Sequence, residues 1–377
     1  MTYLISDNIV SPLGFSTEEN FSAIMRQQSA IKMYNDELNN HIPYCAALMN
    51  QDQINEKWNS LSDETAYTRF EKMAILSIQE ALNNSNIDPA SPDTLFILST
   101  TKGNIELIDP DFPHHFSPDR VYLWKSAQLI GQFFENPHPP IVISSACISG
   151  VTALITAKRL LDCDAYKNVI VCGADLISRF VMTGFQSLKG LSDQPCRPYD
   201  KEHCGLNLGE GAATIILSNR QVTVTNSIKL IRGSISNDAH HLSAPSRTGE
   251  GLYQSIIRTL QHFDIEQLAF INTHGTATVY NDNMEAIAIT RAQLQEVPVS
   301  SLKGYLGHTL GAAGVIETVL TAHSLVHNKL PGTYGFNTIG TPDPINVVKE
   351  NSNITQPAAL KTASGFGGCN ATLLLSK

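Results

Sequence analysis

The chain has 377 residues, of which 42% are hydrophobic and 16% are charged. This is the composition of an ordinary globular protein, and the length suffices for one large or two medium domains with a sizeable core. The formal net charge of -9 and the lack of any run of Lys and Arg argue against nucleic-acid binding, because a polyanion would be repelled.

The cysteines indicate a reducing environment. The chain has seven of them, an odd number, and no two have the Cys-x-x-Cys spacing. We therefore expect neither a disulfide framework nor a metal site, and we expect a cytoplasmic location. The apolar run within residues 1–14 lacks the basic residues and the cleavage site of a signal peptide, and it is not a membrane span.

Short apolar runs alternate along the chain with longer segments of helical periodicity. The tracts Met33–Gln53 and Asp109–Arg120 are predicted to be long surface loops or insertions, not linkers. Fully apolar strands predict sheets that are covered on both faces, as in an α/β fold. The expected elements are a helix at Arg69–Leu82, strands at Thr94–Leu98 and Ile141–Ser144, a helix at Val151–Leu161, strands at Val169–Cys172 and Ala269–Asn272, and a helix at Gly311–Leu325.

The sequence contains a weak internal repeat. The tripeptide Ile143–Ser145 recurs 156 residues later as Val299–Ser301, and the apolar run at 213–218 recurs 158 residues later. Two matches at nearly the same offset indicate a duplicated α/β unit. We therefore expect two similar halves, residues 1–218 and residues 219–377.

Cys147 is the first candidate for chemistry. It lies where an apolar strand ends and a helix begins, so its sulfur would face the positive end of the helix dipole, which favours the thiolate. That position suits a nucleophile. An isolated cysteine in apolar surroundings is more often a small core residue, so the interpretation depends on its neighbours.

Two histidines follow strands in the second half. His274 comes directly after the strand at 269–272, at the carboxyl end where ligands bind in α/β folds. His308 follows a second short strand, and Lys303 lies between that strand and His308. A cysteine and two histidines at strand-to-helix junctions supply the groups needed for nucleophilic and acid–base catalysis.

The sequence as a whole resembles the beta-ketoacyl-ACP synthases of the I/II type, which are condensing enzymes of fatty acid and polyketide assembly. The resemblance covers nearly the whole chain. It rests on six segments: Ser145–Gly150, Arg197–Ala212, Asn237–Pro245, His274–Thr278, Lys303–Gly314 and Gly365–Asn370.

This resemblance implies the thiolase fold, with five layers α-β-α-β-α and two halves related by pseudo-twofold symmetry. It also implies that Cys147 takes the acyl group, while His274 and His308 support decarboxylation of malonyl-ACP and stabilise the enolate. Lys303 matches the lysine that orders the histidines in the family, and Glu317 matches its acidic partner.

Further roles follow from the same resemblance. The backbone N–H groups of Cys147 and Phe366 would form the oxyanion hole, because the glycines beside Phe366 allow a close approach. Phe366 would also gate the acyl pocket. Thr276 and Thr278 would hydrogen-bond the phosphopantetheine arm or the malonyl carboxylate, and are otherwise ordinary loop hydroxyls. His241 matches the pocket histidine of the family.

The expected activity is that of a beta-ketoacyl-ACP synthase, an acyltransferase of fatty acid or specialised polyene or polyketide biosynthesis. Its substrates would be carried on the phosphopantetheine arm of an acyl carrier protein, with no separate cofactor and no metal. A dimer is implied, either a homodimer or a heterodimer with a related synthase. The acyl chain length stays open, because Leu98–Asn104 replaces a Gly-rich stretch of the family.

Two alternatives remain. The chain could be a chain-length factor, a ketosynthase-like subunit that shapes the tunnel of an active partner; such subunits usually lack the cysteine that Cys147 provides. It could also be a CoA-dependent initiating synthase or a chalcone-synthase type, but that class has Asn where His308 stands.

Overall fold

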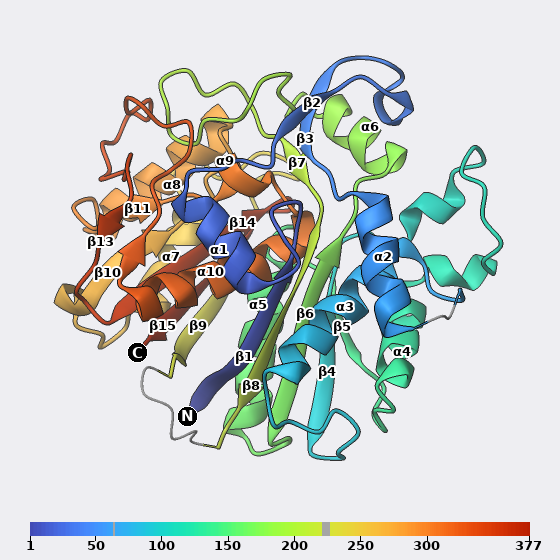
Figure 1. The fold of residues 1–377 in the computed structure, drawn as a ribbon. Coiled ribbons are helices and arrows are strands. Elements are labelled where there is room, and N and C mark those ends of the chain that lie inside the picture. Colours follow the sequence, from blue (N-terminus) through green and yellow to red (C-terminus); the bar gives the residue numbers. More distant parts are fainter. Residues whose placement is uncertain (63–64, 221–226) are drawn as a thin grey trace.

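The computed structural model describes residues 1–62, 65–220 and 227–377. Its main sheet has the strand order β11-β10-β14-β15-β9-β1-β8-β6-β4-β5. In Figure 1 the strands of the second half lie to the left of those of the first half. The first half contributes β1 (Thr2–Val10), β4 (Thr94–Ser99), β5 (Ile141–Ile143), β6 (Asn168–Asp175) and β8 (Gly211–Ser218); the second contributes β9 (Lys229–Asn237), β10 (Leu268–Asn272), β11 (Val299–Ser300), β14 (Ala358–Gly365) and β15 (Cys369–Ser376).

The two halves have the same topology. Outward from their junction, the order is β1-β8-β6-β4-β5 on one side and β9-β15-β14-β10-β11 on the other, with matching parallel and antiparallel pairs. The junction is slight, because β1 and β9 pair only through Thr2 with Leu230 and Tyr3 with Lys229. The predicted duplication is confirmed, while the boundary at residues 218 and 219 stays a prediction.

Helices cover both half-sheets and complete five layers. α3 (Arg69–Asn83) packs on β1, β6 and β8, and α7 (Glu250–Thr259) packs on β9 and β15. Between the half-sheets lie α5 (Ser149–Asp162) and α10 (Ala313–His327), which contact each other and strands of both halves (Figure 1). The predicted five-layered thiolase fold is therefore confirmed.

Local signals place the remaining helices. The side chain of Thr68 caps α3 by accepting the N–H of Glu71, and the Glu71 carboxylate accepts the N–H of Thr68, which satisfies two donors at the helix start. The other α-helices are α1 (Thr17–Met25), α2 (Gln51–Leu61), α4 (Leu123–Phe133), α6 (Arg179–Ser187), α8 (Val279–Arg291) and α9 (Lys303–Leu306).

The prediction of a loop at residues 33–53 is wrong for much of that tract. β2 (Lys32–Tyr34) pairs with β3 (Tyr44–Ala47), and β3 pairs with β7 (Leu208–Gly209) in a second, three-stranded sheet. All of β3 is buried, so a short apolar strand was hidden by its polar flanks. Residues 109–120 run largely as a loop and end in a 3-10 turn.

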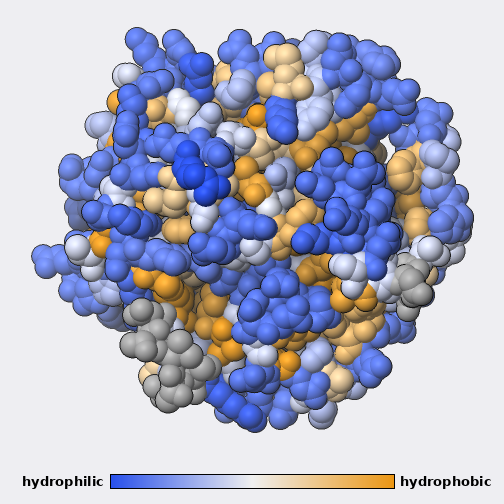
Figure 2. Space-filling model, viewed as in Figure 1, coloured by the Kyte–Doolittle hydropathy of each residue, from blue (hydrophilic) through white to orange (hydrophobic). Residues whose placement is uncertain are grey.

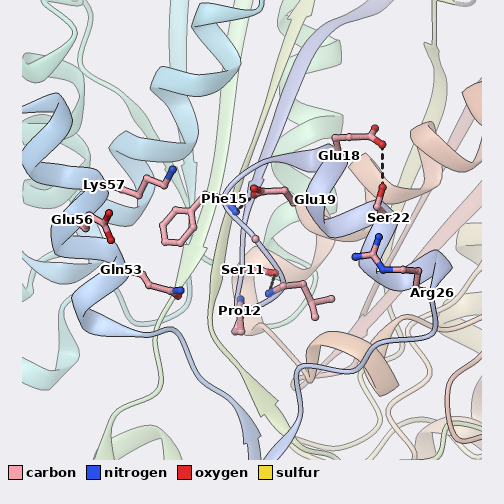
Figure 3. A pocket seen from close by; sticks show the side chains of 12 residues that line it. Ser11, Pro12, Phe15, Glu18, Glu19, Ser22, Arg26, Gln53, Glu56 and Lys57 are labelled. Atoms are coloured by element: carbon pink, nitrogen blue, oxygen red, sulfur yellow. Dashed lines mark hydrogen bonds between the residues drawn. The ribbon is translucent and has the colours of Figure 1, made fainter.

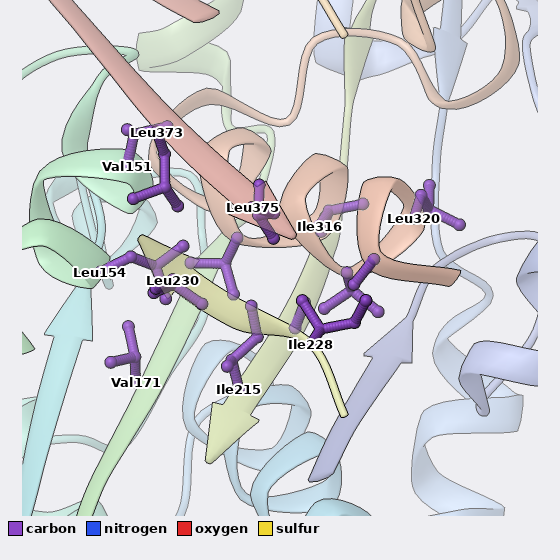
Figure 4. Close-up of a cluster of buried hydrophobic side chains, with 14 of the residues drawn as sticks. Val151, Leu154, Val171, Ile215, Ile228, Leu230, Ile316, Leu320, Leu373 and Leu375 are labelled. Atoms are coloured by element: carbon purple, nitrogen blue, oxygen red, sulfur yellow. The ribbon is translucent and has the colours of Figure 1, made fainter. Parts of the chain in front are cut away.

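The largest apolar cluster surrounds the central helices. Figure 4 shows Val151 and Leu154 of α5 near Leu373 of β15, with Ile316 and Leu320 of α10 in the same cluster. Fully burying each such side chain contributes about 1.5–3 kcal/mol. The face seen in Figure 2 is largely hydrophilic. No helix of the described residues has the length and apolar character required to cross a membrane.

The central helices meet backbone to backbone. A Cβ added to Gly314 would lie 2.4 Å from the backbone nitrogen of Val151, and one added to Gly150 would lie 2.6 Å from that of Val315. Real Cβ atoms do not come so close, so only glycine allows this contact. The contact joins the helix that follows Cys147 to the helix that follows His308.

Replacing Gly314 with Ala should push the two central helices apart. We expect Gly314→Ala to lower the free energy of unfolding by about 1–3 kcal/mol, the usual cost of overpacking a core. Urea denaturation measures this loss. The matched control is Gly184→Ala in α6, where an added Cβ meets nothing within 4 Å and the better helix propensity of Ala should be neutral or stabilising. Equal stability of the two variants would contradict the close contact.

Candidate active site

Cys147 lies on a tight turn between β5 and α5. The preceding residue, Ala146, has a φ of 45°, a left-handed conformation that costs energy for any residue with a side chain. The hydroxyl of Ser149 holds the turn, because it accepts the N–H of Ser145 at 2.8 Å and donates to the carbonyl of Ala146 at 2.6 Å. The turn presents the Cys147 sulfur to a cavity at the start of α5.

The surroundings of Cys147 favour the thiol over the thiolate. Burial raises the pKa of Cys147 to about 11, although the charge of Lys303 and the backbone N–H of Phe366 act in the opposite direction. The helix start alone suggested a thiolate, but the loss of water outweighs it. Acyl transfer at neutral pH therefore needs groups that stabilise the thiolate as the substrate arrives.

The loop that carries His274 is held by two buried carboxylates of α8. Glu285 accepts the N–H of His274 at 2.9 Å and the N–H of Gly275 at 2.6 Å. Asp282 accepts the N–H of Thr276 at 3.1 Å. Both acids are fully buried, so these charge-assisted bonds are made away from water and fix the loop tightly.

His308 is oriented by its backbone and by one ring nitrogen. Gly307, with a φ of 66°, turns the chain after α9, and the N–H of His308 then donates to the carbonyl of Asn207 at 2.7 Å. The Nδ1 atom accepts the N–H of Leu310 at 3.2 Å. A neutral imidazole must therefore carry its proton on Nε2, which has no partner among the described residues.

The three reactive side chains meet in the interior. The Sγ atom of Cys147 and one ring nitrogen from each of His274 and His308 all lie within 4.8 Å of one another. The imidazoles are edge to face, with ring centroids 5.0 Å apart and an interplanar angle of 84°. Burial lowers the pKa of both histidines well below its usual value, and Lys303 lowers it further. Both rings are therefore neutral at pH 7.

A buried ionic cluster lies beside the histidines. Lys303 at the start of α9 forms an ion pair with Glu317 of α10, as the resemblance led us to expect. A second lysine, Lys361 of β14, lies 2.6 Å from the other oxygen of Glu317. Burial raises the pKa of Glu317, but the two lysines outweigh it, so the pKa lies below its usual value. The carboxylate is thus charged at neutral pH.

The cavity above Cys147 has a volume of about 550 Å³ and opens to the surface. Thr276 and Thr278 line it, with their hydroxyl oxygens 2.9 Å apart. Phe366 also lines it and packs against Phe185, with ring centroids 5.6 Å apart. These residues form part of the wall of the cavity that leads to Cys147.

His241 is not brought into this cavity. Its Nδ1 accepts the N–H groups of Ser243 and Ala244, each at 3.2 Å, and the ring is solvent exposed. Ser243 and Ala244 themselves line the cavity, so His241 shapes the loop that borders it. Its predicted part in substrate binding therefore has no direct geometric support.

Three buried residues of the site were missed from the sequence. Asp282 and Glu285 stand on α8 at a spacing of three residues, which places them on one helix face, but nothing marks them as buried. Lys361 lies within an apolar strand, Ala358–Gly365, and a charged residue in such a run was the available signal. A lysine is almost never fully buried without a partner.

Another hollow of about 560 Å³ lies between α1 and α2 and shares no lining residue with the catalytic cavity. Figure 3 shows Glu18 bonded to Ser22 on α1, facing Glu56 and Lys57 on α2. Acidic and basic groups are mixed in this hollow. None of the described residues that line it is a cysteine or a histidine, so they do not offer nucleophilic chemistry like that of Cys147.

The neutral imidazoles can be tested by titration. In ¹⁵N-histidine NMR spectra, we expect the signals of His274 and His308 to show protonation of the rings only at a pH well below about 6.5, the usual pKa of histidine. His274→Ala and His308→Ala spectra assign the signals. Protonation of either ring near pH 6.5 or above would contradict the burial and the lysine charges as causes.

Comparisons with known proteins agree with this geometry. Residues 5–222 match the model of the beta-ketoacyl synthase N-terminal domain, and residues 229–337 match that of the C-terminal domain. The 3-oxoacyl-(acyl-carrier-protein) synthase 2 of Vibrio cholerae is 27% identical over 98% of this chain and 97% of its own length. The tetracenomycin polyketide synthase ketoacyl synthase alpha subunit of Streptomyces glaucescens is 27% identical over 89% and 88%.

Solved structures show the same fold. A chain of the solved complex of a ketosynthase with its chain length factor from Xenorhabdus doucetiae superposes with a TM-score of 0.87 at 23% identity, covering 100% of this chain and 97% of that chain. A nucleophile and two neutral imidazoles on this fold, with family models matching both halves, lead to one conclusion: the chain belongs to the beta-ketoacyl synthase family.

Proposed function

We propose that the protein is a beta-ketoacyl-ACP synthase that condenses an acyl group held on Cys147 with malonyl-ACP. The observation that carries this proposal is the meeting of the Cys147 sulfur with His274 and His308 in one buried pocket. That set provides a nucleophile and two N–H donors whose side chains are buried. The names of the relatives, which include acyl-carrier-protein synthases, support the choice of carrier.

The first step is acyl transfer. The Cys147 sulfur attacks the carbonyl of the acyl thioester, and the backbone N–H groups of Cys147 and Phe366 stabilise the negative oxygen. The carrier thiol leaves with the proton of Cys147, so the acyl group ends on the sulfur. The proximity of Phe366 supports this role, because its backbone N–H acts to lower the pKa of the Cys147 thiol.

The second step joins two carbons. Malonyl-ACP loses carbon dioxide, and the electron pair of the broken bond forms an enolate whose oxygen accepts hydrogen bonds from His274 and His308. The enolate carbon attacks the acyl-Cys147 carbonyl, the carbon–sulfur bond breaks with its electron pair on the sulfur, and 3-oxoacyl-ACP leaves. The Cys147 thiolate then takes up a proton from solvent and returns to the thiol. The unpartnered Nε2 of His308 supports this role, since its proton is free to donate.

The other predicted residues have supporting roles. Thr276 and Thr278 contact the phosphopantetheine arm or the malonyl carboxylate, and Phe366 gates the channel. Lys303 with Glu317 orders the histidines. No separate cofactor or metal takes part, because the carrier brings the reactive thioester. We place the enzyme in the reducing cytoplasm, in fatty acid or specialised polyene or polyketide synthesis, as a homodimer or with a related synthase.

A partner-subunit role is the competing proposal. The similarity to a ketosynthase that was solved with its chain length factor is compatible with either member of such a pair, because it establishes the fold alone. The presence of Cys147 among the two histidines favours the catalytic member. A chain-length factor would shape the tunnel of an active synthase without being acylated itself.

Intact-protein mass spectrometry distinguishes these proposals. After incubation with a panel of acyl carrier proteins bearing different acyl groups, wild type should gain one acyl mass and Cys147→Ala should gain none. The matched control is Cys204→Ala, which removes a second thiol from the wall of the same cavity and should still be acylated. Addition of malonyl-ACP should then remove the adduct and give a carrier-bound product two carbons longer.

The opposite result would favour the partner subunit. That result is the absence of any adduct on Cys147 with every acyl donor tested, both alone and beside a related synthase.

If adducts do form, the donor that acylates Cys147 fastest would identify the acyl chain length and the pathway.

A further inference from the structure

Lys361 is a fully buried lysine in the middle of an apolar strand. It belongs to β14 and is paired across the sheet with Asn272, the last residue of β10. His274 follows Asn272 by two residues. Lys361 therefore lies beside the start of the loop that carries His274. The reaction proposed above assigns no function to Lys361.

The contacts of Lys361 require a charged ammonium. Its Nζ lies 2.6 Å from a carboxylate oxygen of Glu317 and donates to the carbonyls of Thr362 at 2.7 Å, Thr273 at 3.3 Å and Asn272 at 3.5 Å. Each of these groups is an acceptor, and an ammonium is the form of lysine that only donates. Burial lowers the pKa of Lys361, Glu317 raises it and Lys303 lowers it again, so that the pKa lies below its usual value.

The ionic cluster therefore carries an excess positive charge. Lys303 pairs with one oxygen of Glu317 and Lys361 with the other, so two cations share one anion and leave a net charge of +1. All three side chains are buried, and in such an interior a charge acts strongly on its neighbours. The pKa of His274 and of His308 is lowered first by burial, and both lysines lower it further.

Other buried acids lie near the histidines, and each is held by hydrogen-bond donors of its own. Glu285 is engaged by backbone N–H groups and by the hydroxyl of Tyr199, and Asp175 by backbone N–H groups and threonine hydroxyls. Titratable groups on the elements around the two histidines include Cys147 before α5, Lys102 after β4, Asp175 on β6, Tyr199, His203 and Cys204 in the loop before β7, Asp282 and Glu285 on α8, Lys303 on α9, Glu317 on α10 and Lys361 on β14. Of these, His203 lies 3.6 Å from Asp282.

We propose that Lys361 is a second positioning cation of the condensation site, which anchors the peptide before His274 and keeps both imidazoles neutral so that they donate hydrogen bonds to the enolate. This inference rests on the proposed condensation reaction. Lys303 orders the site from the side of α9, and Lys361 does so from the sheet. The two lysines hold the intervening Glu317 in place.

The test replaces Lys361 without changing its length greatly. Lys361→Met removes the charge and the donors, while Lys361→Gln removes the charge but keeps a donor for a carbonyl. Leu360→Met is the matched control, because it changes the neighbouring buried residue on the opposite face of β14. Thermal unfolding of all three shows which variants remain folded.

Two readouts follow the imidazoles. In ¹⁵N-histidine NMR, both charge-removing variants should raise the pKa of His274 and His308 by about one unit, since a positive charge that opposed protonation is gone. In single turnovers of pre-acylated enzyme with malonyl-ACP, the acidic limb of carbon dioxide release should move to higher pH by a similar amount. Leu360→Met should move neither.

A double variant separates the effect of the lost charge from an effect of misfolding. Lys361→Met combined with Glu317→Gln removes one charge of each sign and restores the net charge of +1. The histidine pKa values and the acidic limb of carbon dioxide release should therefore both return toward those of wild type. Unmoved imidazole titrations in the single variants, or equal rate losses at every pH, would overturn the proposal. The NMR readout needs no turnover, so it judges Lys361 even if Cys147 never takes an acyl group and the proposed function fails.

Discussion

The site depends on the backbone contact between α5 and α10. Gly150 and Gly314 allow these helices to approach with no side chain between them, and each helix follows a reactive segment of its own half. If larger residues separated the helices, Cys147 would move away from His308, although each half would keep its own fold. The catalytic distances are therefore set in the middle layer of the molecule, not by the loops at the cavity mouth.

A dry interior determines the chemical state of the groups in the site. Burial acts in the same direction on Cys147, His274 and His308, since it favours the uncharged form of each. Charged groups lie behind these three side chains. They are Lys303 and Lys361, each of which forms an ion pair with Glu317. Neutral groups thus face the substrate while fixed charges act on them from behind.

Much of this arrangement could be predicted from the sequence, because it is encoded locally. The strand before Cys147, the repeat at an offset of 156 residues and the spacing from Lys303 to His308 are all visible in short segments. What could not be predicted depends on contacts between distant segments. The burial of β3 needs β7, and the pairing of Lys361 needs α10. The preference for thiol at Cys147 arises from the same long-range burial.

The symmetry of the fold has a consequence for its history. Lys303 stands 156 residues after Cys147, the same spacing that relates the repeated tripeptides at the ends of β5 and β11. Cys147 and Lys303 thus occupy equivalent places in two copies of one unit. Two identical copies would have presented either two thiols or two ammonium groups, and neither pair could carry out this chemistry. Divergence at this position, together with the placement of His274 and His308 in the second copy alone, makes the two halves complementary.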